Sequence, residues 1–390
     1  MSRNPFLYFC SVKKLFGNSI RLVFFLLIIS NLSSLSAKSN DTIFVPNLQI
    51  EIRASHGFII CHHPEMRVFS SHFPLFEASL QQATFGRKSW QSKSNYPTVG
   101  VSFLYTGIGE HPELGRAFAL IPYMSFNCLK SKRHQLNFKL GIGLGYLTQK
   151  FDAATNPKNT FIGSHFNAAI NLAFSYNYMI TKRFGATAFL GFTHFSNGSS
   201  RTPNNGINIA HAGVGVNYFI TQPKQRIPKQ PSDNKQYRSW NKDNLSFYVA
   251  LSFSRKDIDE YLAYGKSWTV YNLQFNALKR LTEMSKLGIS VDLVYDMTDK
   301  EVLRHKGIAF TDIEILKPGI SASYELAFGS TSFMINFGCH IAGKDLCEGR
   351  VYQKLAMLQN IGKGVFATIS LTTHYGWADY IGLGLGYRIH

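Results

Sequence analysis

The sequence contains long segments in which apolar side chains alternate with polar residues or glycine. One segment covers residues 136–146, and its apolar members are Leu136, Phe138, Leu140, Ile142, Leu144 and Tyr146. A period of two is typical of a β-strand with one apolar face. A second segment repeats the pattern over residues 162–180. Both are much longer than the strands of soluble proteins, which average about six residues.

The length and polarity of these segments indicate a membrane barrel. Strands of roughly ten residues or more, with one apolar and one polar or glycine-rich face, cross the bacterial outer membrane with the apolar face toward lipid. The aromatic residues Tyr176 and Tyr178 fit the ends of such a strand. After residue 37, no apolar run approaches the roughly 18 to 20 residues that a membrane helix needs. We therefore expect an all-β fold, an antiparallel transmembrane β-barrel of outer-membrane type.

The N-terminal segment has the features of a secretory signal peptide. Basic residues precede an apolar run at residues 22–29, and small residues follow at 33–37. This order predicts a signal peptide over residues 1–37, cleaved near Ala37. The alternative, an uncleaved signal anchor, is disfavoured because an apolar run of about nine residues is too short to span a bilayer. We expect the processed chain in the outer membrane of a Gram-negative cell.

The candidate strands divide the chain into two halves. We expect about eight strands in residues 38–221 and about eight more in 245–390, separated by a polar linker at 222–244. Two architectures fit: an eight-stranded barrel followed by a second barrel-like half, or one barrel of about 16 strands. The segments that begin at Phe184 and Phe366 are similar after a one-residue shift, which raises the possibility of an internal duplication.

Charge and histidine spacing limit the ligands. There are 41 Lys and Arg residues against 23 Asp and Glu, a net charge of +18. A basic chain suits an anionic partner, either nucleic acid or acidic lipid. The predicted signal peptide would export the chain away from the compartment that holds nucleic acid. We therefore expect the anionic partner to be membrane lipid. His62, His63 and His165 lack Cys or acidic partners at metal-ligand spacing. We therefore interpret them as rim or lumen residues, and expect no metal and no cofactor.

A polar motif occupies the connection between two predicted strands, residues 193–208. Here the sequence resembles the outer-membrane lipid A 3-O-deacylases, also described as acyloxyacyl hydrolases, whose signature is His-x-Ser-Asn followed by a Pro-Asn-x-Gly turn. The matching residues, at unbroken spacing, are His194, Ser196, Asn197, Pro203, Asn204 and Gly206. The resemblance covers about residues 134–220. The segments 373–379 and 386–388 are similar to the second half of longer family members.

The resemblance implies a function and a set of roles. Family members remove an ester-linked acyl chain from lipid A, the anchor of lipopolysaccharide, with a serine as nucleophile and a histidine as base. The resemblance implies these roles for Ser196 and His194 in this chain. By the same resemblance, Asn197 and the backbone amide of Gly198 are expected to form an oxyanion hole, with Asn204 in the same loop. Alternation supports this chemistry, because residues two apart on a strand share a face with Cβ atoms about 7 Å apart.

The sequence departs from the family at the acid that orients the histidine. That acid is expected two residues after the turn glycine, where this chain has Asn208. An asparagine oxygen can fix the imidazole tautomer but provides no negative charge. Alternation places Asn208 on the outward face with His194, so we expect it to be the third catalytic member. In the second half, His374 is followed by Gly376 where the first half has Ser196. We therefore expect a structural second half.

Two functions follow from these patterns. The first is a lipid A deacylase with a Ser-His mechanism; the alternative is a non-enzymatic barrel, a pore or scaffold, with a degenerate site. The enzyme is favoured because a polar trio at the lipid boundary costs free energy in a passive barrel. Lipid A phosphates would lie near basic strand ends and loops. The basic residues at such positions are Lys132, Arg133, Lys150, Lys182, Arg183 and Arg201. The sequence sets no oligomeric state.

Overall fold

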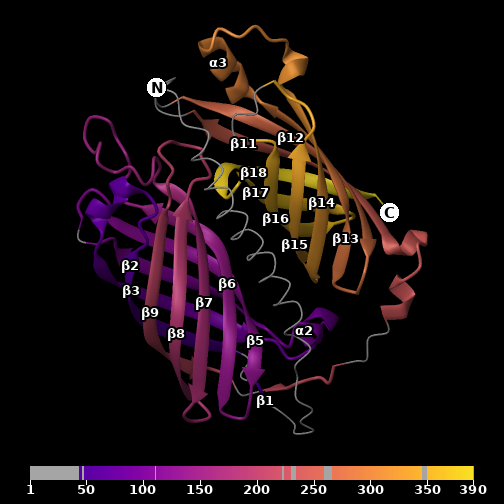
Figure 1. Ribbon diagram of the computed structural model, residues 1–390. Coiled ribbons are helices and arrows are strands. Elements are labelled where there is room, and N and C mark those ends of the chain that lie inside the picture. Colours follow the sequence, from indigo (N-terminus) through magenta and orange to yellow (C-terminus); the bar gives the residue numbers. More distant parts are fainter. Residues whose placement is uncertain are drawn as a thin grey trace. The chain divides into compact units, whose positions relative to one another are not determined.

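The computed structural model contains two closed, antiparallel β-barrels of eight strands each (Figure 1). It describes residues 44–45, 48–109, 111–221, 224–229, 234–258, 266–344 and 349–389. The predicted all-β barrel fold is confirmed. Of the two expected architectures, the single barrel of about 16 strands is wrong. The predicted signal peptide lies outside the described residues. Over these ranges, no helix has both the length and the apolar character needed to cross a bilayer.

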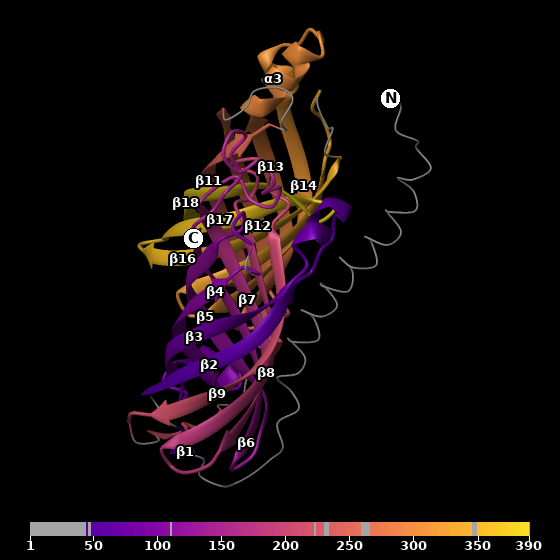
Figure 2. The same cartoon turned by 90° about the vertical axis from the view of Figure 1, so that its left-hand side faces the viewer.

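The first barrel runs from β2 to β9. Its strands are β2 (Leu48–Ile59), β3 (His72–Ala83), β4 (Thr98–Gly107), β5 (Arg116–Lys130), β6 (His134–Leu147), β7 (Phe166–Met179), β8 (Phe184–Ser196) and β9 (Ile207–Phe219). Each strand pairs with the next, and β2 pairs with β9 to close the barrel. Figure 2 shows this barrel from a side on which indigo β2 and pink β9 are neighbours.

The second barrel runs from β11 to β18. Its strands are β11 (Leu245–Asp257), β12 (Ser267–Arg280), β13 (Ser285–Asp296), β14 (Leu316–Phe328), β15 (Thr331–His340), β16 (Val351–Gly362), β17 (Val365–His374) and β18 (Trp377–Ile389). It closes in the same way, through pairing of β11 with β18. The helix α3 (Met297–His305) and the 3-10 turn η4 (Asp312–Ile315) lie between β13 and β14.

Short elements accompany the barrels. These are β1 (Phe44–Val45), η1 (Pro64–Phe69), α2 (Ser89–Lys93), β10 (Lys224–Gln225), η2 (Asn234–Tyr237) and η3 (Lys242–Asn244). The predicted polar linker therefore contains some secondary structure, since β10 pairs with β1. The backbone N–H of Ile227 donates to the Phe85 carbonyl at 2.7 Å, and the Arg226 guanidinium lies 4.5 Å from the centre of the Tyr96 ring. These contacts show that a segment poor in apolar side chains still packs through backbone hydrogen bonds and ring contacts.

The outer face of the first barrel is apolar. Its interior contains paired charges and also a cluster of buried apolar side chains at the end where β2 ends and β3 begins. Leu190 and Val214 face outward with 68% and 64% of their surface exposed. Inside, the Arg53 guanidinium pairs with Glu51 at 2.9 Å. The buried Lys139 ammonium likewise pairs with Glu77 at 2.6 Å. Buried charges need such partners because removing them from water is costly. An apolar outer face around a lumen with paired charges is typical of a barrel surrounded by lipid.

The second barrel follows the same rule with a denser ionic network. Buried Lys256 forms ion pairs with Asp296, at 3.2 Å, and with Asp379. Another buried ion pair joins Lys354 to Asp292. The second oxygen of Asp292 accepts a hydrogen bond from a tyrosine hydroxyl at 2.7 Å. Charges of both signs therefore pair with one another in the lumen of this barrel, beside a cluster of buried apolar side chains.

The connections of the first barrel differ between its two ends. At one end, two connections are tight turns at 131–133 and 180–183, and the third, residues 84–97, contains α2. The opposite end, called the long-loop end below, carries four loops that are each longer than the two tight turns. These loops are residues 60–71, 108–115, 148–165 and 197–206. Outer-membrane barrels place their longer loops on the extracellular side. The residues of the polar motif lie at this long-loop end.

Candidate active site

His194 and Ser196 lie in the last three residues of β8, at the long-loop end. They share the outward face of β8 with the exposed Leu190, because side chains two residues apart on a strand point to the same side. His194 pairs directly with Asn208 at the start of β9. The strand register therefore brings together the histidine and the asparagine that the sequence placed on one face.

The His194 ring is held by a short hydrogen bond. Its Nδ1 lies 2.6 Å from Oδ1 of Asn208. Since an amide oxygen only accepts, Nδ1 carries the hydrogen, and Nε2 of the neutral ring is left with a lone pair. Gly206 makes room for the ring: its φ is +74°, and a Cβ there would lie 2.8 Å from Cε1 of His194. The arrangement orients the imidazole as a base requires.

The Asn204 side chain holds the Ser196 hydroxyl. Its Nδ2 donates to Ser196 Oγ at 3.1 Å, and the same hydroxyl can donate to Asn204 Oδ1 at 3.2 Å. Asn204 Oδ1 also accepts the backbone N–H of Asn197 at 3.0 Å. The serine oxygen therefore lies beside an amide N–H donor that is fixed by a second bond to the loop.

The Asn197 side chain is held by two hydrogen bonds within the loops of the site. Its side-chain N–H groups donate to Ser164 Oγ and to the Arg201 carbonyl, both at 2.9 Å. The bond to Ser164 ties the loop after β8 to the loop before β7, and the bond to Arg201 lies within the loop after β8. Gly198 follows in the left-handed region, with φ of +59°. Asn204, expected in the same loop, places a side-chain N–H donor at the serine oxygen.

His62 is a residue of this site that sequence reasoning missed. Its Nδ1 lies 3.2 Å from Nδ2 of Asn208, although the two residues are 146 positions apart in the chain. His62 follows the end of β2, and pairing of β2 with β9 brings it to the site. No local spacing marks it. The signal that could have found it is the register between the first and last strands of the barrel.

His374 faces the opposite way from His194. It is buried in the second barrel, where Nε2 lies 3.2 Å from an Asp379 oxygen and Nδ1 lies 3.0 Å from the Val351 carbonyl. Its neighbours on the inward side of β17 are polar or buried. The similarity between the segments around the two histidines therefore does not place them at equivalent positions on the barrel wall.

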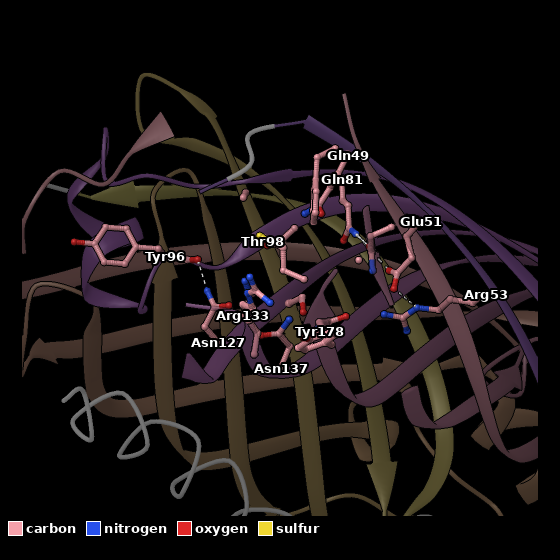
Figure 3. Close-up of a pocket in the computed structure, with 18 residues that line it drawn as sticks. Gln49, Glu51, Arg53, Gln81, Tyr96, Thr98, Asn127, Arg133, Asn137 and Tyr178 are labelled. Atoms are coloured by element: carbon pink, nitrogen blue, oxygen red, sulfur yellow. Dashed lines mark hydrogen bonds and ion pairs between the residues drawn. The ribbon is translucent and has the colours of Figure 1, made fainter. Parts of the chain in front are cut away.

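The remaining predicted features divide between the two ends of the first barrel. Of the six basic residues proposed for lipid headgroups, Lys150 and Arg201 belong to the long loops, and the other four lie in or beside the tight turns. A cavity inside the barrel, lined by Gln49, Tyr178 and Arg133 among others, lies at the tight-turn end (Figure 3). It is separate from the polar motif. In the part of the chain that the structure describes, no cluster of three or more His, Cys, Asp or Glu side chains is placed to hold a metal ion.

Two family models match the two barrels in turn. The model described as lipid A 3-O-deacylase (PagL) matches residues 75–217, and the model described as acyloxyacyl hydrolase, C-terminal domain, matches residues 244–390. The chain belongs to the lipid A 3-O-deacylase family. Within this deacylase-family chain, the first match contains the whole polar motif of residues 193–208, and His62 lies outside it.

Solved structures that resemble parts of this family member include a surface protein, an outer membrane enzyme and a porin. Neisserial surface protein A shares 9% identity over 44% of this chain and 97% of its own, with a TM-score of 0.32. The outer membrane enzyme PagL shares 15% identity over 43% of this chain and 98% of its own, with a TM-score of 0.28. A porin from Rhodopseudomonas blastica shares 6% identity over 88% of this chain and 99% of its own, with a TM-score of 0.17. No curated protein matches the chain.

Proposed function

We propose that this protein is an outer-membrane lipid A deacylase that hydrolyses an ester-linked acyl chain of lipopolysaccharide. Family membership supports the substrate. The observation that carries the proposal is the 2.6 Å hydrogen bond between His194 and Asn208 on the outward face of the barrel, beside Ser196. No cofactor is needed, since serine acyl transfer uses a nucleophile, a base and hydrogen-bond donors.

The proposed reaction begins at Ser196. Nε2 of His194 takes the hydroxyl proton as Oγ attacks the ester carbonyl carbon, and a tetrahedral intermediate forms. When the intermediate collapses, the C–O bond to the lipid breaks, and His194 returns the proton to the departing lipid hydroxyl. Water then attacks the carbonyl carbon of the acyl-serine, again with His194 as base. The bond from that carbon to Oγ of Ser196 breaks, His194 returns the proton to Oγ, and the fatty acid leaves. Asn208 keeps the proton on Nδ1 through both steps.

The negative charge on the intermediate needs a donor close to Ser196. The Nδ2–H of Asn204 lies 3.1 Å from the serine oxygen, so it can turn to the oxyanion as that charge develops. Asn204 Oδ1 is anchored by the Asn197 backbone N–H at 3.0 Å, which limits movement of the amide. We propose that Asn204 is a side-chain donor of the oxyanion hole and that the Gly198 backbone amide is a second donor.

The location of the site suits a membrane lipid as substrate. His194 and Ser196 lie where the apolar outer face of β8 ends and the long loops begin. Lipid A diffusing in the bilayer would reach them laterally, with its acyl chains against residues such as Leu190. Lys150 and Arg201, in loops at the same end, are proposed to contact its phosphates. We further propose that the mature protein begins after cleavage near Ala37.

Mass spectrometry of lipid A tests this proposal. The full-length protein is expressed in Gram-negative cells that lack such an activity, and lipid A is compared with that of cells expressing Ser196→Ala. We expect the parent to remove one acyl chain and the variant to remove none, while both chains appear as folded barrels in the outer membrane. Unchanged lipid A with a folded parent would overturn the enzymatic function and support the non-enzymatic barrel.

A further inference from the structure

We infer that His62 is a positioning residue that fixes the side-chain amide of Asn208, so that its oxygen faces His194. The inference rests on the proposed function, because it concerns how the base is oriented. A carboxylate at this position would have two equivalent oxygens, and either could accept the imidazole N–H. An amide has an accepting end and a donating end. A site with asparagine therefore needs a further group that selects the orientation.

The hydrogen bonds around His62 determine its protonation pattern. Its Nε2 lies 2.9 Å from the Asn205 carbonyl oxygen. A carbonyl only accepts, so this nitrogen carries the hydrogen. In a neutral ring, Nδ1 then has a lone pair and accepts a hydrogen bond. The group that faces it is Nδ2 of Asn208, at 3.2 Å. The Ile60 carbonyl lies farther from the same nitrogen, at 3.4 Å, and cannot donate.

This pattern aligns the hydrogen bonds in one direction across the site. His62 accepts from Asn208 Nδ2, Asn208 Oδ1 accepts from His194 Nδ1 at 2.6 Å, and Nε2 of His194 is left to take the proton of Ser196. The reverse orientation of the Asn208 amide would direct its oxygen at the lone pair of His62. It would also direct an N–H at Nδ1 of His194, forcing the proton onto Nε2 and removing the base.

The backbone keeps His62 in place. The N–H of Ile60 donates to the Asn208 carbonyl at 2.8 Å, which continues the β2–β9 pairing as far as the site. Two residues later, His62 reaches both Asn205 and Asn208 from the same side. The position of the ring therefore follows from barrel closure, and its hydrogen-bond pattern from the carbonyl of Asn205.

Kinetic measurements on His62→Ala in two versions of the protein test this inference. His62→Ala is assayed on lipid A in the parent and in Asn208→Glu, whose carboxylate needs no selection. In the parent we expect kcat to fall on the order of tenfold to 10²-fold with little change in KM. In Asn208→Glu we expect a loss under about twofold, a clear deviation from additivity. The matched control is His134→Ala, which changes an exposed histidine at the tight-turn end. It should leave kcat unchanged in both backgrounds. Equal losses in both backgrounds would overturn the inference.

A second measurement gives an answer that does not depend on activity. Histidine labelled with ¹⁵N reports which ring nitrogen of His194 carries the proton, with the signal assigned by its loss in His194→Gln. We expect a single Nδ1–H form in the parent and a mixture of both tautomers in His62→Ala. An unchanged Nδ1–H form would overturn the inference. If the parent releases no acyl chain, the proposed function fails, and the tautomer result alone decides the role of His62.

Discussion

The two barrels place a strand-end histidine on opposite sides of the wall. In the first barrel, His194 faces outward and is bonded to a neutral amide, Asn208. In the second, His374 faces the lumen and lies beside a carboxylate, Asp379, which also pairs with Lys256. Judged by charge alone, the second pair is closer to a hydrolase dyad. A lipid substrate cannot enter a lumen filled with paired charges, so the face of the wall on which a histidine lies is more informative than its partner.

The largest expected effect separates the two histidines directly. His194→Ala removes the proposed base, and deacylation should fall by about 10⁴-fold or more, as for other catalytic serine–histidine pairs. His374→Ala should leave the deacylation rate unchanged. Both rates are measured on lipid A with equal amounts of folded barrel. Comparable losses in the two variants would show that the lumen of the second barrel takes part in the reaction.

The next effect concerns the stability of the second barrel. Lys256→Met removes the ammonium group nearest to the buried Asp296 and Asp379, while Lys317 stays 3.7 Å from Asp296. Removing one partner of a buried pair costs about 3–5 kcal/mol. The lower stability should appear as a lower unfolding temperature in lipid. The unfolding is measured by the loss of the compact form on unheated gels. Lys344→Met is the control, because its ion pair with Glu314 is at the surface, where such pairs contribute about 0–1 kcal/mol. Equal unfolding temperatures would contradict a structural function of the network.

A smaller effect tests the outward face itself. Leu190 lies in the middle of β8 with 68% of its surface exposed. In a soluble protein, Leu190→Arg would be harmless. On the lipid side of a barrel near the bilayer midplane, arginine costs about 2–4 kcal/mol. Unfolding by urea in lipid vesicles measures the difference, and Leu190→Ala serves as the control for lost side-chain volume. An arginine variant as stable as the alanine variant would argue against lipid contact at this face.

The smallest effect gives the first histidine the kind of partner that the second one has. Asn208→Glu adds a negative charge that stabilises the imidazolium formed during the reaction. We expect kcat on lipid A to stay equal or rise a few-fold. A fall in kcat would mean that the site is built around the amide, and that a carboxylate disturbs its contact with His62.

Much of the fold followed from local pattern. The alternation over residues 136–146 lies within β6, His134–Leu147, because a period of two is a property of neighbouring residues. The segment expected from residue 162 starts later, with β7 at Phe166. Ile162 instead forms an isolated bridge with Asn204, so its apolar side chain packs in the loop and does not extend the strand. A loop residue at the correct parity cannot be distinguished from a strand residue by sequence.

The features that were not predicted depend on distant pairing. One barrel of about 16 strands and two of eight have the same alternation, and only the pairing of β2 with β9 and of β11 with β18 separates them. The same applies to the site. Parity placed His194 and Asn208 on one face, since both lie on neighbouring strands of one hairpin. His62 is 146 positions from Asn208 in the sequence, and no pattern within β8 or β9 points to it.

The pairing of β2 with β9 closes the first barrel and also brings His62 to Asn208, so the candidate site is complete only in the closed barrel. During folding, β9 is the last strand of the first barrel to be synthesised, and its partner β2 is the first. Until they pair, His62 lies far from Asn208, and nothing holds the amide against rotation. A partly folded chain in transit to its membrane would therefore carry a serine and a histidine that are already neighbours, yet a base with no fixed tautomer. If the proposed function holds, hydrolysis would begin only after β2 and β9 have paired.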